Sequence, residues 1–119
     1  MTISATAYTK IISDLVQRVG SGQLDGVARA ADLLTAAVRA GGVIHAFGCG
    51  HSEAVAKEIA GRAGGLVPTS RIELRDVVLY GGEPASVLAD PRLELDPAIA
   101  RRLFELAPVR PEDAPAWSS

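Results

Sequence analysis

Apolar residues in the first third of the chain recur at helical spacing. Between residues 8 and 19 they are separated by polar side chains and fall at Tyr8, Ile11, Ile12, Leu15, Val16 and Val19. After the Ser21-Gly22 break a second set follows, at Leu24, Val27, Ala28, Ala31, Leu34 and Val38. Intervals of three and four residues predict two amphipathic helices. Further alanines widen the apolar arc of the second helix, which indicates contact on two sides, with a sheet and a neighbouring helix or with another subunit.

The pattern from residue 41 to residue 65 is typical of a strand that turns into a helix. Gly41-Gly42 ends the second helix. The run 43–47 is apolar except for His45 and lies between glycines, as expected for a buried parallel strand. Helical spacing returns over residues 52–63 and stops at Gly64-Gly65. The sequence therefore predicts a buried strand, a tight glycine turn and a helix in direct succession.

The second half of the chain gives weaker signals. Leu66-Val67-Pro68 predicts a second short strand, residues 71–80 fit either a strand or a loop, and residues 81–84 predict a turn. Asp96-Pro97 has the form of an N-cap followed by proline at the first helical position, so a helix should begin there and end before Pro108.

Composition narrows the class of protein. The chain has 119 residues, 48% of them hydrophobic and 22% charged, which fits one small globular domain. Its formal net charge is -2 and its arginines are scattered, so no nucleic-acid partner is expected. No apolar run is long enough to span a bilayer, so no membrane partner is expected. A single cysteine forms no internal disulfide, and we expect a cytoplasmic location.

Candidate chemistry lies in the turn Gly48-Cys49-Gly50-His51-Ser52. Backbone N–H groups at the start of a helix lack partners within the helix, and the helix dipole favours an anion there. The two glycines permit the close backbone approach that an anion needs, and the Ser52 hydroxyl adds a donor. The dinucleotide-binding pattern is excluded because Glu53 stands at its third glycine, and the nucleotide P-loop is excluded because its lysine is absent. We therefore expect these five residues to bind phosphate.

Each of these side chains also has a purely structural interpretation. Ser52 is an obvious N-cap, worth about 1 kcal/mol with or without a ligand. His51 is a candidate hydrogen-bond donor to the phosphate or a candidate acid-base group. It is equally well explained as a solvent-exposed turn residue. The helix start can lower the pKa of the Cys49 thiol, but a small residue in a tight turn is an equal explanation. His45, inside an apolar strand, is expected to be a hydrogen-bonded core residue.

Taken together, residues 41–68 resemble the first half of a sugar isomerase (SIS) domain, especially bacterial SIS proteins related to phosphoheptose isomerase. The resemblance covers Tyr8 to Val67 and thins out afterwards. It implies an α/β fold in which an N-terminal helical pair precedes part of a parallel three-layer αβα sheet, with phosphosugar bound at the carboxyl ends of the strands. Gly48, Gly50 and Ser52 match the first phosphate-contacting loop of that family.

The resemblance also suggests chemistry in the following helix. Glu58-Ile59-Ala60-Gly61-Arg62 fits the pattern of the family's isomerases, so the resemblance implies that Glu58 is the catalytic base. His51 is the second candidate acid-base residue, on the chemistry of a histidine in the turn rather than on this pattern. A helical ion pair with Arg62 is the structural alternative for Glu58, as a pair with Lys57 is for Glu53. Phosphoheptose isomerase has a zinc-binding histidine where this chain has Ala54. We therefore expect no metal and no cofactor.

The resemblance is expected to stop near Asp113. Residues 110–113 resemble the lead-in to a later strand, but Pro115 stands where a buried central strand should begin, and a proline cannot donate to the ladder. The expected organisation is a single partial SIS domain over residues 1–119, with a helical pair at 8–40, the first part of the sheet at 41–113 and a tail at 114–119. The chain would be the N-terminal part of the domain.

The predicted function is binding of a sugar phosphate. Aldose-ketose isomerisation of the phosphoheptose isomerase type is the expected chemistry of a complete domain, while catalysis by the chain as it stands is left open. The alternatives are a phosphosugar-sensing module without turnover and a structural remnant that only oligomerises. In each case the apolar helical pair should be buried in a homo-oligomer.

Overall fold

The computed structural model describes residues 4–117, with side-chain surroundings described as far as residue 114. The chain divides into two compact units, one ending at Thr35 and the other beginning at Ala36. Every element of the α/β sheet and the cavity discussed below belong to the second unit.

Two helices open the chain, as the apolar spacing predicted. Helix α1 spans Ala5–Gly22, and helix α2 spans Leu24–Arg39. The Ser4 hydroxyl caps α1 by accepting a hydrogen bond from the Ala7 N–H at 3.1 Å. No residue of α1 is buried within the chain. Among residues 4–117, its apolar stripe is therefore left exposed, whereas an amphipathic helix is usually stabilised by burying that stripe.

A parallel three-stranded sheet forms the centre of the second unit. Strands β1 (Ile44–Phe47), β2 (Thr69–Ile72) and β3 (Ala114–Trp117) lie in the order β2-β1-β3. β1 pairs with both neighbours, so that Ile44 lies opposite Thr69 on one side and Ala114 on the other. The apolar run of the sequence forms the central strand β1. A strand that is covered on both faces consists mainly of apolar residues.

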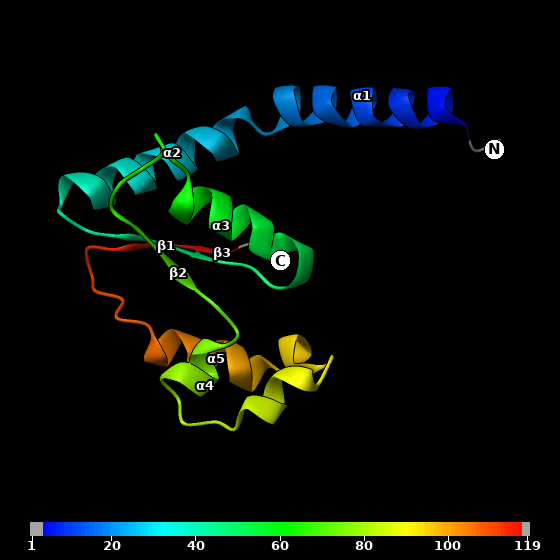
Figure 1. Cartoon of the computed structure of the whole chain (residues 1–119). Coiled ribbons are helices and arrows are strands. Elements are labelled where there is room, and N and C mark those ends of the chain that lie inside the picture. Colours follow the sequence, from blue (N-terminus) through cyan, green and yellow to red (C-terminus); the bar gives the residue numbers. More distant parts are fainter. Residues whose placement is uncertain (1–3, 118–119) are drawn as a thin grey trace. The chain divides into compact units, whose positions relative to one another are not determined.

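Helices cover both faces of this sheet (Figure 1). Helix α3 (Glu53–Gly61) lies against one face, and helices α4 (Asp76–Leu79) and α5 (Pro97–Leu106) lie on the other. Short 3-10 turns at Gly50–Ser52, Ala85–Ala89 and Leu93–Leu95 connect these elements. Ile72, Val77 and Leu103 form a buried cluster between the sheet and the α4–α5 layer. The arrangement confirms the expected α/β class, with helices, sheet and helices in three layers.

The Asp96-Pro97 signal is confirmed at the start of α5. The Asp96 carboxylate accepts a hydrogen bond from the Ala98 N–H at 2.9 Å, and Pro97 is the first helical residue. The turn expected over residues 81–84 is confirmed in part, because the observed turn covers Tyr80 and Gly81 and is followed by Gly82 with a φ of 78°.

The expected strand at Leu66–Pro68 is wrong. These residues form a bend, with the Val67 side chain 92% exposed, and β2 begins at Thr69. The Pro68 carbonyl accepts a hydrogen bond from the Ile44 N–H at 2.8 Å, so the ladder starts where the apolar run ends. Apolar character alone did not locate the strand, because β2 buries only one position fully, Ile72.

The expectation that Pro115 stops the sheet is also wrong, because β3 begins at Ala114 and continues through the proline. The Ala114 N–H donates to the Val43 carbonyl at 3.0 Å. Successive N–H groups of a strand point to opposite sides, so an N–H at position 115 would point away from β1. Within the described residues β3 is an edge strand, and there a proline removes no bond from the ladder.

Candidate functional site

The glycine turn follows β1 directly, at the carboxyl end of the central strand. Cys49 has extended backbone angles, and Gly50 then adopts a φ of 54°. This left-handed conformation is strained for residues with a Cβ, so glycine is the residue that the turn requires. The chain thereby reverses within three residues and enters α3 through the 3-10 turn Gly50–Ser52.

Part of the expected amide cradle is used by the turn itself. The Ser52 N–H donates to the Cys49 carbonyl at 3.0 Å, and the Glu53 N–H donates to the Gly50 carbonyl. Among the described residues, the N–H groups of Gly50 and His51 have no protein acceptor. These two amides are therefore the ones that remain available to an anion.

The Ser52 hydroxyl does not cap α3. Ser52 has helical backbone angles, and its side chain makes no capping hydrogen bond. A capping residue normally has extended angles, which direct its oxygen toward the following N–H groups. The N-cap interpretation of Ser52 is wrong in this respect, and in the described part of the chain its hydroxyl has no hydrogen-bond partner.

A cavity of about 710 Å³ lies beside this turn, at the carboxyl ends of β1 and β2. Its wall includes Gly48, Cys49 and Gly50. The rest of the wall comes from α3, from β2 and the loop after it, and from the segment of 3-10 turns, and comprises Glu53, Lys57, Arg71, Glu73, Leu74, Arg75, Leu88, Asp90, Pro91, Leu93 and Glu94. Three of the five expected phosphate-binding residues thus share one cavity, whereas His51 and Ser52 are not among its lining residues.

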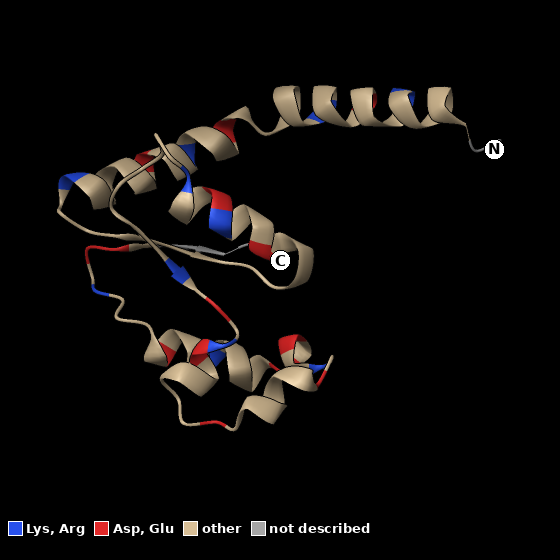
Figure 2. Ribbon diagram, viewed as in Figure 1, with Lys and Arg blue, Asp and Glu red and all other residues tan. Residues whose placement is uncertain are grey.

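The cavity wall carries many charged side chains, and its basic and acidic residues are nearly equal in number. Lys57 lies 2.6 Å from Glu53 along α3, and Arg71 lies 3.3 Å from a carboxylate oxygen of Glu73. Arg75 also pairs with Glu73, at 2.5 Å. Figure 2 shows basic and acidic residues close together along α3 and after β2. Three cations with rotatable side chains therefore surround a cavity that also carries carboxylates.

Glu94 approaches the glycine turn itself. Its Oε2 lies 3.7 Å from the point where a Cβ would stand on Gly50. Burial raises the pKa of the Cys49 thiol above its ordinary value, and the carboxylates of Glu94 and Glu53 raise that pKa further. The thiol is therefore not activated by the helix start, and the small size of Cys49 in a tight turn explains the residue better.

Glu58 and His51 lie outside the cavity. The Glu58 side chain is 65% exposed and pairs with Arg62 at 3.3 Å, which is the helical ion pair expected from the i, i+4 spacing. The Glu53–Lys57 pair is confirmed in the same way, and the hydrogen bond from Lys57 lowers the pKa of the Glu53 carboxyl. His51 is exposed. Catalytic roles for Glu58 and His51 remain predictions.

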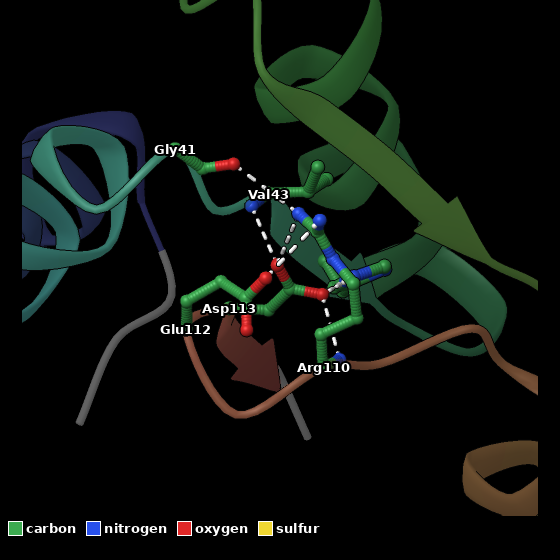
Figure 3. Close-up of polar contacts among 6 residues, drawn as sticks. Gly41, Val43, Arg110, Glu112 and Asp113 are labelled. Carbon is green, nitrogen blue, oxygen red and sulfur yellow. Dashed lines mark hydrogen bonds and ion pairs between the residues drawn. The ribbon is translucent and has the colours of Figure 1, made fainter.

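A second polar cluster lies at the opposite end of β1, around Asp113 (Figure 3). One carboxylate oxygen accepts hydrogen bonds from the Val43 N–H at 2.8 Å and from the Arg110 guanidinium at 3.2 Å. The other accepts from the Arg110 N–H at 2.8 Å and contacts His45 Nε2 at 3.0 Å. The side chains of His45 and Asp113 are 3% and 1% exposed. The expectation that His45 is a hydrogen-bonded core residue is confirmed.

These contacts lower the pKa of the Asp113 carboxyl far below its ordinary value. The largest cause is the hydrogen bond from the Val43 N–H, followed by the bonds from Arg110 and His45. The sequence did not identify Asp113 as a central residue. Its partners Val43 and His45 are 70 and 68 positions away, so no local pattern could have found it.

The described residues contain neither a metal-binding cluster nor a membrane-spanning helix. Within residues 4–117, no group of three or more His, Cys, Asp and Glu side chains gathers as a metal site would require. None of the described helices combines the length and hydropathy that crossing a membrane demands.

Comparison with known proteins identifies the family. A family model described as the SIS domain matches residues 7–117. A UPF0309 protein of Geobacillus kaustophilus is 33% identical over 106 residues, which cover 89% of this chain and 41% of that protein. A UPF0309 protein of Streptomyces coelicolor is 34% identical over 101 residues, which cover 85% of this chain and 39% of that protein.

The chain therefore spans about two fifths of the length of these relatives. No solved structure matches the chain significantly. The family match extends from the first helix through the glycine turn to the third strand of the sheet. The chain belongs to the SIS domain family.

Proposed function

We propose that the glycine turn binds the phosphate group of a sugar phosphate. The observation that carries this proposal is that the N–H groups of Gly50 and His51, at the start of α3, have no acceptor among the described residues, while Gly50 lines the charged cavity beside them. Helix starts with open amides bind phosphate because the N–H groups point outward and the helix dipole favours negative charge. Membership of the SIS domain family supports the same ligand class.

The cavity fits the remaining part of such a ligand. Its volume of about 710 Å³ lies in the range of pockets that hold small molecules. Arg71, Arg75 and Lys57 can turn toward a phosphate, since each is held only by a partly exposed ion pair. The carboxylates of Asp90 and Glu73 can accept hydrogen bonds from sugar hydroxyls.

Calorimetric titration with inorganic phosphate, with a panel of aldose and ketose phosphates and with the unphosphorylated sugars tests the proposal. Saturable binding of the phosphorylated members alone is expected. Ser52→Ala should weaken binding by about tenfold, because a hydrogen bond to a charged oxygen is lost. Equal binding of sugars with and without phosphate, or no binding at all, contradicts the proposal and leaves the structural remnant as the better description.

The finer proposal is aldose-ketose isomerisation of the phosphoheptose isomerase type, with Glu58 as base and His51 as the second acid-base group. Proton transfer between adjacent carbons of an open-chain sugar needs a base close to the substrate. In this chain Glu58 pairs with Arg62 outside the cavity, which favours the alternative of a phosphosugar-binding module without turnover. Interconversion of aldose and ketose phosphates by the wild type, abolished in Glu58→Gln, supports catalysis; binding without interconversion supports the module.

We further propose that the chain forms a homo-oligomer through its N-terminal helices. Six large apolar side chains of α1 are exposed within the chain, at Tyr8, Ile11, Ile12, Leu15, Val16 and Val19. A stripe of this size is typical of an interaction surface. Multi-angle light scattering should give the mass of a dimer or larger species, and Val16→Lys should reduce that mass. A stable wild-type monomer contradicts this proposal.

A further inference from the structure

Glu73 follows the last residue of β2 and lines the cavity beside the glycine turn. Its side chain is 11% exposed. Two hydrogen bonds fix the backbone around it: the Glu73 N–H donates to the Asp76 carboxylate at 2.9 Å, and the Asp76 N–H donates to the Glu73 carbonyl at 2.9 Å. A hydrogen-bonded turn at the start of α4 therefore supports the Glu73 carboxylate, and such support keeps a side chain in one place.

The Glu73 carboxylate contacts two arginines of the same cavity wall. One oxygen lies 3.3 Å from Arg71 Nη1, and the other contacts Arg75 Nε. The side chains of Arg71 and Arg75 are 35% and 58% exposed, so both are open to solvent. Two guanidinium cations thus share one carboxylate, and the three side chains together carry an excess of positive charge.

Each arginine retains donors that Glu73 does not use. A guanidinium has five N–H donors in a planar fork. The closest contacts of Arg71 and Arg75 are made to different oxygens of the carboxylate, so Glu73 occupies only part of each fork. The remaining N–H groups suit phosphate oxygens, which arginine forks bind by charge-assisted hydrogen bonds. An anion can therefore bind both arginines without breaking either ion pair.

The two arginines lie close to the start of α3. Glu53 is the first residue of α3 and lines the same cavity. The hydrogen bond from Lys57 is the largest cause that lowers the pKa of the Glu53 carboxyl, and the charges of Arg71 and Arg75 lower that pKa further. Salt screens charges near a protein surface over about 10 Å, so both guanidinium groups lie near the helix start that follows the open Gly50 amide.

We propose that Glu73 is a positioning residue of the phosphate site, where it holds Arg71 and Arg75 so that their unused donors face the phosphate at the glycine turn. This inference rests on the proposed binding of a sugar phosphate. An arginine without a partner samples many rotamers, and a ligand that orders it loses affinity. Because Glu73 orders both side chains before the ligand arrives, that loss is reduced.

The substitution Glu73→Gln distinguishes positioning from the effect of charge alone. It removes a negative charge from the cavity wall, and by charge alone it should strengthen the binding of an anion. Release of both arginines acts in the opposite direction, and we expect phosphate to bind about three- to tenfold more weakly. Glu94→Gln is the matched control in the same wall and should bind phosphate about two- to fivefold more tightly at low salt.

Inorganic phosphate is titrated into the full chain while the amide resonances of Gly50 and His51 give the dissociation constant. The same titration is carried out for Glu73→Gln and Glu94→Gln. Tighter binding in both variants shows that Glu73 acts only through its charge and overturns the inference, while the proposed function stands. Wild-type resonances that do not move with phosphate contradict the proposed function and, with it, this inference.

A double substitution tests whether Glu73 acts through the arginines. In the Arg71→Gln/Arg75→Gln background no guanidinium remains to be held, so adding Glu73→Gln should change phosphate affinity by less than about twofold. A merely structural role of Glu73 would weaken binding equally in both backgrounds, and that result overturns the inference.

Arg75→Lys gives an independent measurement, which is needed should Glu73→Gln unfold. It keeps the positive charge but loses the planar fork. We expect about tenfold weaker phosphate binding, the factor of one hydrogen bond to a charged group. Equal affinities of Arg75→Lys and the wild type show that the fork does not bind phosphate and overturn the inference.

Discussion

The two ends of β1 carry polar clusters of opposite kinds. At the amino end, the Asp113 carboxylate is buried and accepts four protein contacts, from Val43, His45 and Arg110. At the carboxyl end, the glycine turn leaves the N–H groups of Gly50 and His51 without acceptors in the part of the chain that the structure describes. The Asp113 carboxylate is saturated by the protein itself, whereas the glycine turn retains hydrogen-bonding capacity for a molecule from outside.

The degree of hydrogen-bond saturation distinguishes a structural cluster from a candidate binding site more clearly than the residue types do. Both ends of the strand contain a histidine and charged neighbours, so composition alone does not distinguish them. A buried, saturated carboxylate fixes the register of β3 against β1, because its bonds form only when residues 43, 45 and 110–113 meet. Open amides on a glycine turn contribute little to stability and are available to bind an anion.

The largest expected effect is the loss of the saturated cluster in Asp113→Asn. An amide cannot replace a carboxylate that accepts at both oxygens, so the contacts with His45 and Arg110 are weakened. Thermal unfolding should show a larger fall in Tm than any other substitution discussed here. Asp14→Asn, which removes an exposed pair with Lys10, is the control and should change stability by less than about 0.5 kcal/mol.

The same cluster predicts the acid sensitivity of the fold. The folded-state pKa of Asp113 lies below its unfolded value of about 3.9, so its contribution to stability is complete above that value. That contribution is lost progressively as the pH falls below about 4 toward the depressed folded-state pKa. Chemical denaturation between about pH 7 and pH 2 should show this loss in the wild type and a smaller loss in Asp113→Asn. Parallel pH profiles would assign acid sensitivity to other carboxyl groups.

The next largest effect concerns the close approach of two chain segments beside Asp113. A Cβ on Gly42 would collide with the backbone carbonyl of Glu112, which cannot move without displacing β3. Gly42→Ala should therefore destabilise the protein by about 1–3 kcal/mol, the usual cost of overpacking. Gly61→Ala, where nothing lies within 4 Å, should be neutral or stabilising by up to about 1 kcal/mol. Similar denaturation midpoints for both variants would argue against the close contact.

A comparison of Ser52→Ala with Asp96→Ala tests whether the start of α3 lacks a side-chain cap while the start of α5 has one. Asp96 is a true cap with a 2.9 Å bond from the Ala98 N–H, so its loss should cost about 1 kcal/mol. The Ser52 hydroxyl makes no capping bond, so its loss should cost less than about 0.5 kcal/mol in urea unfolding while still weakening phosphate binding. Equal losses of stability would restore the cap interpretation of Ser52.

The smallest expected effect is electrostatic. Glu94 brings a carboxylate close to the Gly50 turn, where it opposes an incoming phosphate. Glu94→Gln should strengthen phosphate binding by about two- to fivefold at low salt, in line with the weak interactions of exposed charges. The gain should shrink as ionic strength rises. Unchanged phosphate affinity in calorimetry would mean that Glu94 turns away when the ligand binds.

Local sequence determined the elements whose signals lie within one or two turns of chain. The apolar spacing of α1 and α2, the glycine turn before α3 and the Asp96-Pro97 start of α5 were all predicted correctly, because backbone angles and caps depend on adjacent residues. The family resemblance added the α/β class, which the three-layer arrangement confirms.

Tertiary structure alone decided how distant segments pair. It placed β2 at Thr69 rather than in the apolar run before it, and it carried β3 through Pro115, whose missing N–H would point away from β1. It also brought Asp113 to His45 and Glu94 to Gly50. Hydrogen-bond saturation depends on partners some 70 positions apart, so the sequence named the glycine turn as a candidate, and only the fold distinguished its open amides from the closed cluster at the other end of the strand.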